Sequence, residues 1–192
     1  MAELDAGAWD ALAGESPFVR HAFRAALEAT DCVGAHIGWE PVHLALFRDG
    51  VLAAAMPLYV KHHSWGEFVF DWSWASAHAR HGLDYYPKLL CAVPYSPVTG
   101  PRLLVGTGNG ADARRATLIA AITDEVTRLG LSSAHLNFVE DIDAVALDDF
   151  GLLSRFDWQF HWHNRDWPDF DAFLGALTSK KRKNIRQERA QV

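Results

Sequence analysis

The spacing of apolar residues predicts helices in several parts of the chain. Apolar residues recur at helical spacing from Phe18 to Leu27, directly after Ser16-Pro17, a pair typical of a helix start. This helix is expected to end between residues 30 and 34. Residues 111–129 show the same period and precede Gly130, a common helix terminator. Further helices are predicted over residues 72–81, 141–150, 169–177 and 179–192.

Alternation of apolar and polar residues predicts the strands. Residues 42–47 alternate, Asp49-Gly50 is a strong two-residue hairpin turn, and residues 51–61 form the returning strand. Pro57 implies a bulge or a sheet edge in that strand, because proline has no N–H to donate to a ladder. Other strands are predicted over residues 68–70, 89–93, 102–105, 134–139 and 152–162, the last rich in aromatic side chains.

The order of these elements indicates an α/β (α+β) domain with a mixed, twisted sheet flanked by helices. The chain has 192 residues, of which 49% are hydrophobic, so it can bury one sizeable core. Eight Trp residues and a charged fraction of 22% argue against disorder.

Nothing in the sequence predicts a signal peptide or a membrane span. The N-terminus lacks a basic and an apolar segment, and no window approaches 18 uninterrupted apolar residues. Cys32 and Cys91 lie in apolar or small-residue surroundings without metal or redox spacing, which favours free thiols. A cytoplasmic location is therefore expected.

The charge of the chain is divided unevenly. The net charge is −6, yet the last thirteen positions hold six basic residues and only one acidic residue, Glu188. Ser179 is a suitable helix cap, and no Gly or Pro interrupts the residues after it. We expect a basic helix over residues 179–192. Because Ile185 and Val192 would be poorly covered on that helix alone, we also expect a partner or a further domain beyond it.

A broad resemblance covers residues 102–162. A strand, a Gly-containing loop, a helix of about five turns and a second strand with a short helix resemble the core of the GNAT N-acetyltransferase fold. The pyrophosphate loop of that family runs Gln/Arg-x-x-Gly-x-Gly/Ala. Here Val105 follows Arg102 by three positions, and the glycines stand at 106, 108 and 110. No cofactor-binding residue is therefore assigned.

A narrower resemblance spans nearly the whole chain. Its motifs include Gly38-Trp-Glu-Pro, Ser64-Trp-Gly-Glu-Phe-Val-Phe-Asp-Trp, Tyr85-Tyr-Pro-Lys-Leu, Val93-Pro-Tyr-Ser-Pro-Val-Thr-Gly-Pro-Arg and Ser179-Lys-Lys-Arg-Lys-Asn-Ile-Arg. They resemble the bacterial peptidoglycan biosynthesis/recognition family, predicted N-acyltransferases akin to Fem-type aminoacyl transferases with two GNAT-like halves. The resemblance implies that residues 1–178 form the N-terminal GNAT-like domain. It also implies that residues 179–192 form a linking helix toward a missing second half.

Glu67 and Asp71 are the candidate catalytic residues. They flank Phe-Val-Phe, and on a strand their spacing places both carboxylates on one face. An amine attacks a thioester or an ester only in its neutral form, so a carboxylate near the nucleophile can serve as the general base or anchor the amine. The structural alternative is an Asp71 helix cap together with a surface Glu67.

A second group of residues is a candidate for substrate binding. The segment from residue 85 to 102 is rich in proline, and rigid loops of this kind hold polar groups at low entropic cost. Cationic side chains there suit anionic groups, and hydroxyls suit orientation. The alternative is a proline-locked crossover whose tyrosines cap the core. The candidates are Tyr85, Tyr86, Lys88, Ser96, Thr99 and Arg102.

The sequence favours neither a metal nor a covalent intermediate. His78 and His81 lie three apart on a predicted helix, but no HExxH motif or Cys partner accompanies them. No Ser-His-Asp or Cys-His constellation can be identified. No tightly bound cofactor is expected, and the co-substrate implied by the resemblance is acyl-CoA or aminoacyl-tRNA.

The function predicted from the sequence is N-acyl transfer to an amine acceptor, a small molecule or a cell-wall precursor. This chain would form the acceptor side of the cleft. Nucleic-acid binding is not expected, because the body is acidic and carries no RNA-binding motif. The alternative function is a non-catalytic module that recognises a ligand or a peptidoglycan precursor.

Overall fold

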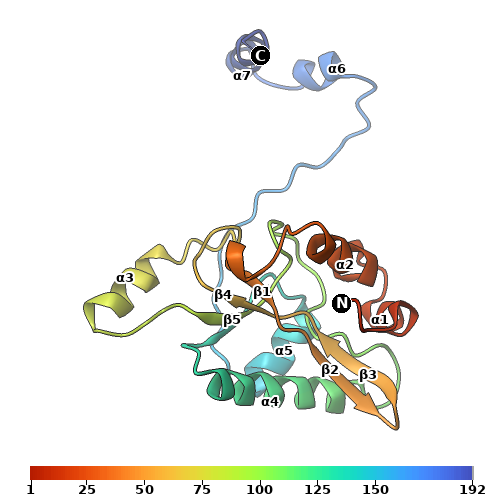
Figure 1. Ribbon diagram of the computed structural model, residues 1–192. Helices are drawn as coiled ribbons and strands as arrows, with labels where there is room; N and C mark the ends of the chain where they lie inside the picture. The colour runs from red at the N-terminus through yellow and green to blue at the C-terminus, as the bar shows by residue number, and fades with distance from the viewer. Residues whose placement is uncertain (192) are drawn as a thin grey trace. The chain divides into compact units, whose positions relative to one another are not determined.

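A computed structural model describes residues 1–191 of the chain (Figure 1). Residues 1–155 form one compact unit, and the residues from Phe156 onward form a second. The compact unit thus ends before residue 178, the last residue of the predicted domain. The division of function between residues 1–178 and 179–192 stays a prediction.

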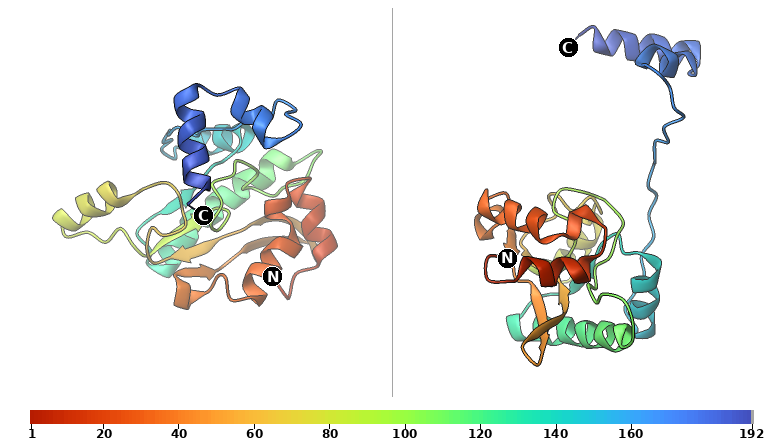
Figure 2. Two further views of the ribbon diagram at one scale, coloured as in Figure 1. Left: turned by 90° about the horizontal axis from the view of Figure 1, so that it is seen from above. Right: turned by 90° about the vertical axis from the view of Figure 1, so that its right-hand side faces the viewer.

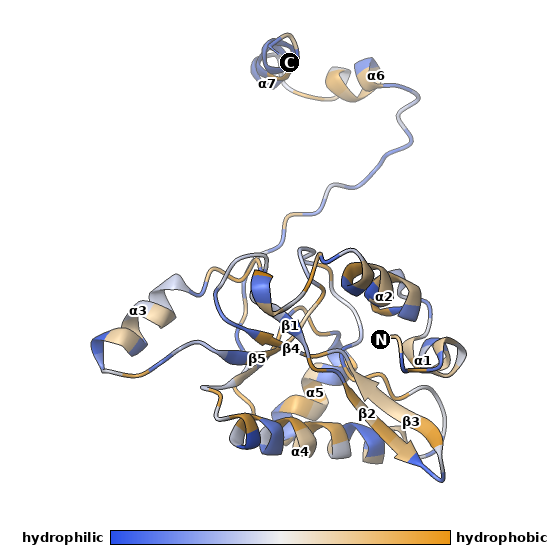
Figure 3. Ribbon diagram, viewed as in Figure 1, coloured by the Kyte–Doolittle hydropathy of each residue, from blue (hydrophilic) through white to orange (hydrophobic). Residues whose placement is uncertain are grey.

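The first unit is built on a mixed four-stranded sheet with the strand order β1-β4-β5-β6. Its strands are β1 (Trp39–Pro41), β4 (Tyr59–Lys61), β5 (Lys88–Cys91) and β6 (Ala134–Leu136). Strand β4 is antiparallel to both β1 and β5, whereas β5 and β6 are parallel. Two further strands, β2 (Leu44–Arg48) and β3 (Val51–Met56), pair as a separate hairpin that is mostly hydrophobic (Figure 3).

Helices cover both faces of this sheet. The helices α4 (Ala111–Leu129) and α5 (Asp141–Asp149) lie on one side, and α1 (Ala6–Ala13) and α2 (His21–Ala29) lie on the other (Figures 1 and 2). The α/β class with a mixed sheet flanked by helices is therefore confirmed. The remaining helices of this unit are α3 (Trp72–Arg80) and two short 3₁₀ turns, Pro17–Val19 and Ala35–Ile37.

Alternate residues of β5 contribute to two of the three hydrophobic clusters formed by the described residues. Leu89 and Cys91 pack with Leu118 and Ile122 of α4 on one face of the sheet. Leu90 points to the opposite face, as the two-residue period of a strand requires. There it packs in a second cluster whose other members include Trp39, Tyr59 and Leu27.

The strongly periodic elements are where the sequence predicts them. The structure confirms the helix over residues 111–129, and Gly130 ends it with a φ of 65°. It also confirms the hairpin around Asp49-Gly50. Pro57 interrupts the returning strand, so that β3 stays with the hairpin while β4 joins the main sheet.

Three predicted strands are wrong or reduced. Phe68 and Phe70 have φ values of 60° and 51°, so residues 68–70 turn sharply instead of extending. Residues 102–105 make only one bridge, between Leu104 and Ala55. Residues 152–162 alternate in character but form no strand within the described chain, and Phe160 is 99% exposed. Alternation creates an apolar face, but it does not supply a hydrogen-bonding neighbour.

The predicted N-terminal helix is divided in two. Arg20 adopts an extended conformation between the 3₁₀ turn and α2. A carboxylate oxygen of Asp10 accepts a hydrogen bond from the His21 backbone N–H (2.7 Å), so a residue of another helix satisfies the start of α2. Helix α1 was not predicted, although Asp5 caps it by accepting from the Ala8 N–H (2.7 Å).

The second unit contains α6 (Phe170–Gly175) and α7 (Ser179–Arg189). Helix α7 is mostly hydrophilic (Figure 3), and Thr178 rather than Ser179 occupies its N-cap position. Trp162 and Trp167 pack on Phe173 of α6 at ring distances of 6.2 and 5.2 Å. The predicted helix over 179–192 is thus confirmed up to Arg189, and Val192 lies outside the described residues. No helix of residues 1–191 has the length and apolar character needed to cross a membrane.

A buried carboxylate anchors the long segment between β5 and α4. Asp143 of α5 is 1% exposed and accepts hydrogen bonds from the backbone N–H groups of Arg102 (2.7 Å) and Leu103 (3.0 Å). Its other oxygen pairs with Arg115 of α4 at 3.3 Å. One side chain therefore connects a strandless segment to two helices.

We predict that Asp143→Ala lowers the free energy of unfolding by about 3 kcal/mol, because it leaves two buried N–H groups and an arginine without their acceptor. Urea denaturation monitored by tryptophan fluorescence measures the change. Asp149→Ala, an exposed aspartate of the same helix, is the matched control and should alter stability by less than about 0.5 kcal/mol. Equal stability of the two variants would refute the anchoring role.

Candidate functional site

Two lysines stand side by side on the central sheet. Lys61 ends β4 and Lys88 begins β5, and the antiparallel register pairs them directly. Both side chains are fully buried. Like charges at paired positions destabilise a sheet, so this arrangement requires a nearby negative charge. The loop that follows β4, residues 62–71, supplies it.

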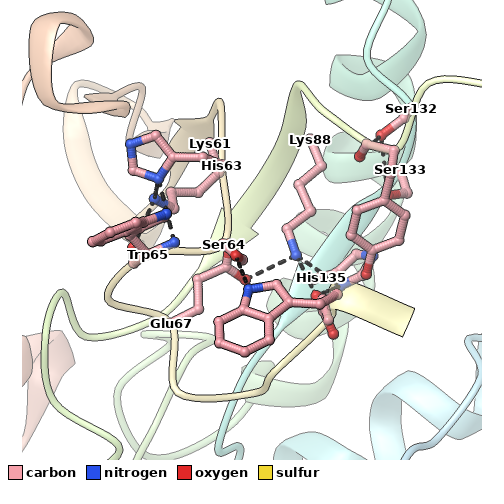
Figure 4. A network of polar contacts seen from close by, with 12 residues as sticks. Lys61, His63, Ser64, Trp65, Glu67, Lys88, Ser132, Ser133 and His135 are labelled. Atoms are coloured by element: carbon pink, nitrogen blue, oxygen red, sulfur yellow. Dashed lines mark hydrogen bonds and ion pairs between the residues drawn. The ribbon is translucent and has the colours of Figure 1, made fainter. Parts of the chain in front are cut away.

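Lys88 lies between two carboxylates of that loop (Figure 4). Its Nζ is 2.8 Å from Glu67 Oε2 and donates a hydrogen bond to Asp71 Oδ2 at 2.7 Å. All three side chains have an exposed fraction of 0%. Charges taken out of water to this extent are tolerated only when they are paired, so the three residues depend on one another.

Asp71 also connects the cluster to two residues that are more exposed. Its Oδ1 is 3.0 Å from Arg155 Nη1, and its Oδ2 is 3.9 Å from His135 Nδ1. Arg155 is 46% exposed at its side chain and stacks over Trp74 at 4.9 Å. Asp71 occupies the N-cap position of α3 but makes no side-chain capping bond, because its carboxylate turns toward Lys88 instead. The predicted helix-cap role is therefore not its role in this structure.

Two tyrosine hydroxyls lie beside the carboxylates that pair with Lys88. The Tyr85 hydroxyl is close to Asp71, and the Tyr86 hydroxyl is close to Glu67 and Ser64. Both tyrosine rings lie about Lys88 Nζ, at 5.0 and 5.1 Å. We refer to Glu67, Asp71, Tyr85, Tyr86, Lys88 and His135 as the Lys88 cluster.

The two carboxylates of the cluster have pKa values shifted in opposite directions. Burial raises the pKa of Glu67, and the nearby Lys88 and Lys61 offset this only in part. Burial acts the same way on Asp71, but hydrogen bonds from Lys88 and Tyr85 outweigh it and lower its pKa. Two carboxylates whose pKa values are moved apart in this way suit different roles, because one can exchange a proton while the other remains ionised.

Burial also shifts the pKa values of the neighbouring groups. Burial, with the positive charge of Lys88, lowers the pKa of His135 to about 4, so the imidazole is neutral at pH 7. Burial raises the pKa of Tyr85 and Tyr86, and the adjacent Asp71 and Glu67 carboxylates raise it further. Burial lowers the pKa of Lys61 to about 8, although Glu67 opposes the shift.

The structure thus brings together five of the residues predicted from the sequence: Glu67, Asp71, Tyr85, Tyr86 and Lys88. It places the other three elsewhere. No contact of Ser96 or Thr99 with the Lys88 cluster is present in the described structure.

Arg102 is buried and holds the backbone. Its guanidinium donates to the carbonyls of Val98 (2.6 Å), Asn137 (2.8 Å) and Pro101 (3.1 Å). The guanidinium of Arg102 therefore makes three hydrogen bonds to backbone carbonyls of the chain itself. A substrate-binding role for Ser96, Thr99 and Arg102 stays a prediction.

Three contributors were missed by the sequence analysis. His135 lies on β6, next to β5, and its position in an alternating strand was the only available signal. Lys61 was assigned to a strand without a role. Arg155 reaches Asp71 across 84 positions, and nothing local indicates that contact. Within residues 1–191, no three His, Cys, Asp or Glu side chains gather in a way that could hold a metal ion.

Comparison with known proteins identifies the family of the chain. The family model FemAB-like, described as peptidoglycan biosynthesis/recognition, matches residues 1–192. The chain belongs to the FemAB-like family. The family resemblance expected from the sequence motifs is thereby confirmed.

Other comparisons are less informative. The search of curated proteins gives no match. Among solved structures, an aminoglycoside N-acetyltransferase in complex with CoA is 14% identical, with 73% of this chain and 87% of that chain covered and a TM-score of 0.42. At this degree of likeness, nothing about the activity of this FemAB-like chain follows from that structure.

We predict that Lys88→Met in this FemAB-like protein lowers the free energy of unfolding by about 3–5 kcal/mol, because two buried carboxylates lose their shared cation. Chemical denaturation at pH 7 measures the loss. Lys180→Met, on an exposed position of α7, is the matched control and should leave stability nearly unchanged. A Lys88→Met protein as stable as the control would show that the cluster is not held by its ion pairs.

The buried Lys61 generates a prediction about pH. Its pKa of about 8 in the folded chain is below the ordinary value of 10.5, so the unfolded chain binds more protons between these two values. Folding stability due to Lys61 is therefore lowest below pH 8 and increases as the pH rises toward 10.5. Relative to Lys61→Met, the wild type should gain on the order of 2 kcal/mol between pH 7.5 and 10.5. Denaturation of both proteins at the two pH values tests this, and a constant difference would contradict it.

Proposed function

We propose that this FemAB-like chain forms the acceptor side of an N-acyltransferase, which transfers an acyl group from an activated donor to an amine. The observation that carries the proposal is the pair of carboxylates around Lys88 with opposite pKa shifts. Family membership supports the reaction class, since the family is described as peptidoglycan biosynthesis/recognition. We propose an amine of a peptidoglycan precursor as the acceptor.

In the proposed reaction, Glu67 is the general base. The acceptor amine loses its proton to the Glu67 carboxylate and attacks the acyl carbonyl, forming a C–N bond. The bond from that carbonyl to the thiol sulfur or ester oxygen of the donor breaks, and the leaving group takes up the second proton, which the nitrogen loses as the amide forms. A base is most effective when its pKa lies near the working pH, which is the direction in which burial moves Glu67.

The other members of the cluster act through Glu67. Asp71 remains ionised and fixes Lys88, and Lys88 in turn orients Glu67. We assign these two as positioning residues. Because Glu67 is fully buried, the proposal requires loop 62–71 to move when the acceptor binds. Acyl-CoA and aminoacyl-tRNA both remain candidate donors, and a cytoplasmic location, where both occur, is part of the proposal.

The second candidate function is a non-catalytic recognition module. The specific observation in its favour is the complete burial of Glu67, Asp71 and Lys88, which is also the arrangement expected of ions that only hold the loop in place. A module of this kind would bind a precursor without binding an acyl donor.

The test is an acyl-transfer assay with the full chain, acetyl-CoA and a panel of amines from peptidoglycan stem peptides, with release of CoA thiol as the readout. We predict that Glu67→Gln lowers turnover by about 100- to 10,000-fold and removes the rise in rate with pH, because Gln cannot accept the proton. Glu15→Gln, an exposed carboxylate outside the cluster, is the control and should leave both unchanged.

Unaltered turnover in Glu67→Gln would refute the catalytic assignment. Binding of a stem peptide without any transfer would favour the recognition module. Circular dichroism of each variant separates loss of activity from loss of fold.

A further inference from the structure

A second feature of loop 62–71 lies outside the Lys88 cluster. An open pocket of about 320 Å³ is lined by Ile37, Trp39, His63, Trp65 and Tyr95. Its volume is at the small end of the range for ligand pockets, about 300–1,000 Å³. Trp39 is buried, whereas Trp65 is 78% exposed and Tyr95 is 42% exposed. One aromatic ring is thus sequestered and two are accessible to solvent.

The pocket is a built feature of the fold. A side chain at Gly66 would meet the Tyr95 ring at 2.7 Å, and one at Gly38 would meet the His63 ring at 2.5 Å. Both glycines have positive φ values, 80° and 75°. Only glycine therefore allows these two rings to lie where they do.

Tyr95 itself is strained. Its φ is 59°, a conformation that costs a non-glycine residue of order 1–3 kcal/mol. Its hydroxyl donates to the Cys32 carbonyl at 2.9 Å, and its ring lies 5.6 Å from that of Trp39. Strained residues held in this way are concentrated at ligand-binding sites.

Most polar side-chain atoms of the lining are already bonded within the protein, but the indole Nε1 of Trp65, which is 78% exposed, makes no hydrogen bond to the described residues. His63 Nε2 donates to the Ile37 carbonyl at 2.9 Å, and Trp39 Nε1 donates to the Trp65 carbonyl at 3.1 Å. The backbone N–H of Trp65 donates to His63 Nδ1 at 3.3 Å, and the Tyr95 hydroxyl donates to the Cys32 carbonyl. Trp39, His63 and Tyr95 therefore offer a ligand chiefly the faces of their rings, and Trp65 offers its ring face together with one indole N–H donor.

A positive charge lies next to the pocket. Lys61 Nζ is 4.3 Å from the centre of the Trp39 ring, and it donates to the Trp65 carbonyl at 3.1 Å (Figure 4). This ammonium group repels a cationic ligand. It does not oppose a neutral or an anionic one, and the low dielectric of its surroundings strengthens the discrimination.

We propose that this aromatic pocket binds a pyranose ring of a neutral or anionic saccharide. The electron-rich face of an aromatic ring attracts the partly positive C–H bonds on the face of a sugar ring. The sugar hydroxyls point to the open side of the pocket and stay hydrated. A nucleobase fits less well, because one indole N–H can pair with only one of the several donors and acceptors on its hydrogen-bonding edge.

The proposal goes beyond acyl transfer and does not depend on it. If the acyltransferase proposal also holds, the saccharide is a part of the acceptor, since Trp65 and Glu67 are two positions apart on one loop. Binding without a donor tests the pocket alone, so the two proposals can fail separately.

The experiment is calorimetric titration of the full chain with N,N′-diacetylchitobiose, a neutral disaccharide, and with its deacetylated form, which is cationic at pH 6. We expect the neutral form to bind at least tenfold more tightly. Trp65→Ala should weaken that binding at least tenfold, and because Trp65 is largely exposed the fold should be retained. Trp158→Ala, a tryptophan that is 88% exposed in the second unit, is the matched control and should bind as the wild type does.

Three outcomes would overturn the proposal. They are no binding of either disaccharide, equal binding by Trp65→Ala and the wild type, and binding of uridine in place of the disaccharide. Lys61→Met tests the role of the charge. This variant should narrow the difference in binding affinity between the neutral and the cationic disaccharide. An unchanged difference in a folded Lys61→Met protein would exclude Lys61 as the source of discrimination.

Discussion

The ion pairs of Lys88 with Glu67 and Asp71 are the interaction on which the rest of this site depends. Lys88 begins β5, the strand that contributes to two of the hydrophobic clusters, while both carboxylates belong to the loop after β4. The pairs therefore fasten an irregular, aromatic loop to the centre of the sheet. Because all three side chains are fully buried, moving any one of them breaks an ion pair in surroundings that water does not reach, and Asp71 also occupies the N-cap position of α3.

Loop 62–71 contributes residues both to the Lys88 cluster and to the aromatic pocket. Lys61 and Lys88 lie opposite each other in the sheet, and Glu67 is close enough to both to influence their charge. Ser64 and Glu67 are near Tyr86 on one side, whereas His63 and Trp65 line the aromatic pocket on the other. A ligand that shifts this loop at the pocket would therefore act on the carboxylate proposed as the base. Loop 62–71 would in this way connect binding at the aromatic pocket to the proposed base Glu67.

Much of the fold could be predicted because it is encoded locally. The period of residues 111–129 and the Asp49-Gly50 turn identify α4 and the hairpin without reference to the rest of the chain. The site was predicted in part: Glu67 and Asp71 were noted for their spacing, although the assumed strand between them is a pair of sharp turns at Phe68 and Phe70. The carboxylates meet at Lys88 because the backbone bends there, not because a strand presents them on one face.

The sequence by itself determined the family, the class of fold and most of the regular elements, since these follow from motifs, periodicity and turn residues a few positions apart. Only the tertiary structure decided which charges meet, because Arg155 and Asp71 are 84 positions apart and Lys61 faces Lys88 through strand register. It also decided the pKa directions, which come from burial, and the conformation of Tyr95. Those properties arise from neighbours that are distant along the chain, and no local pattern records them.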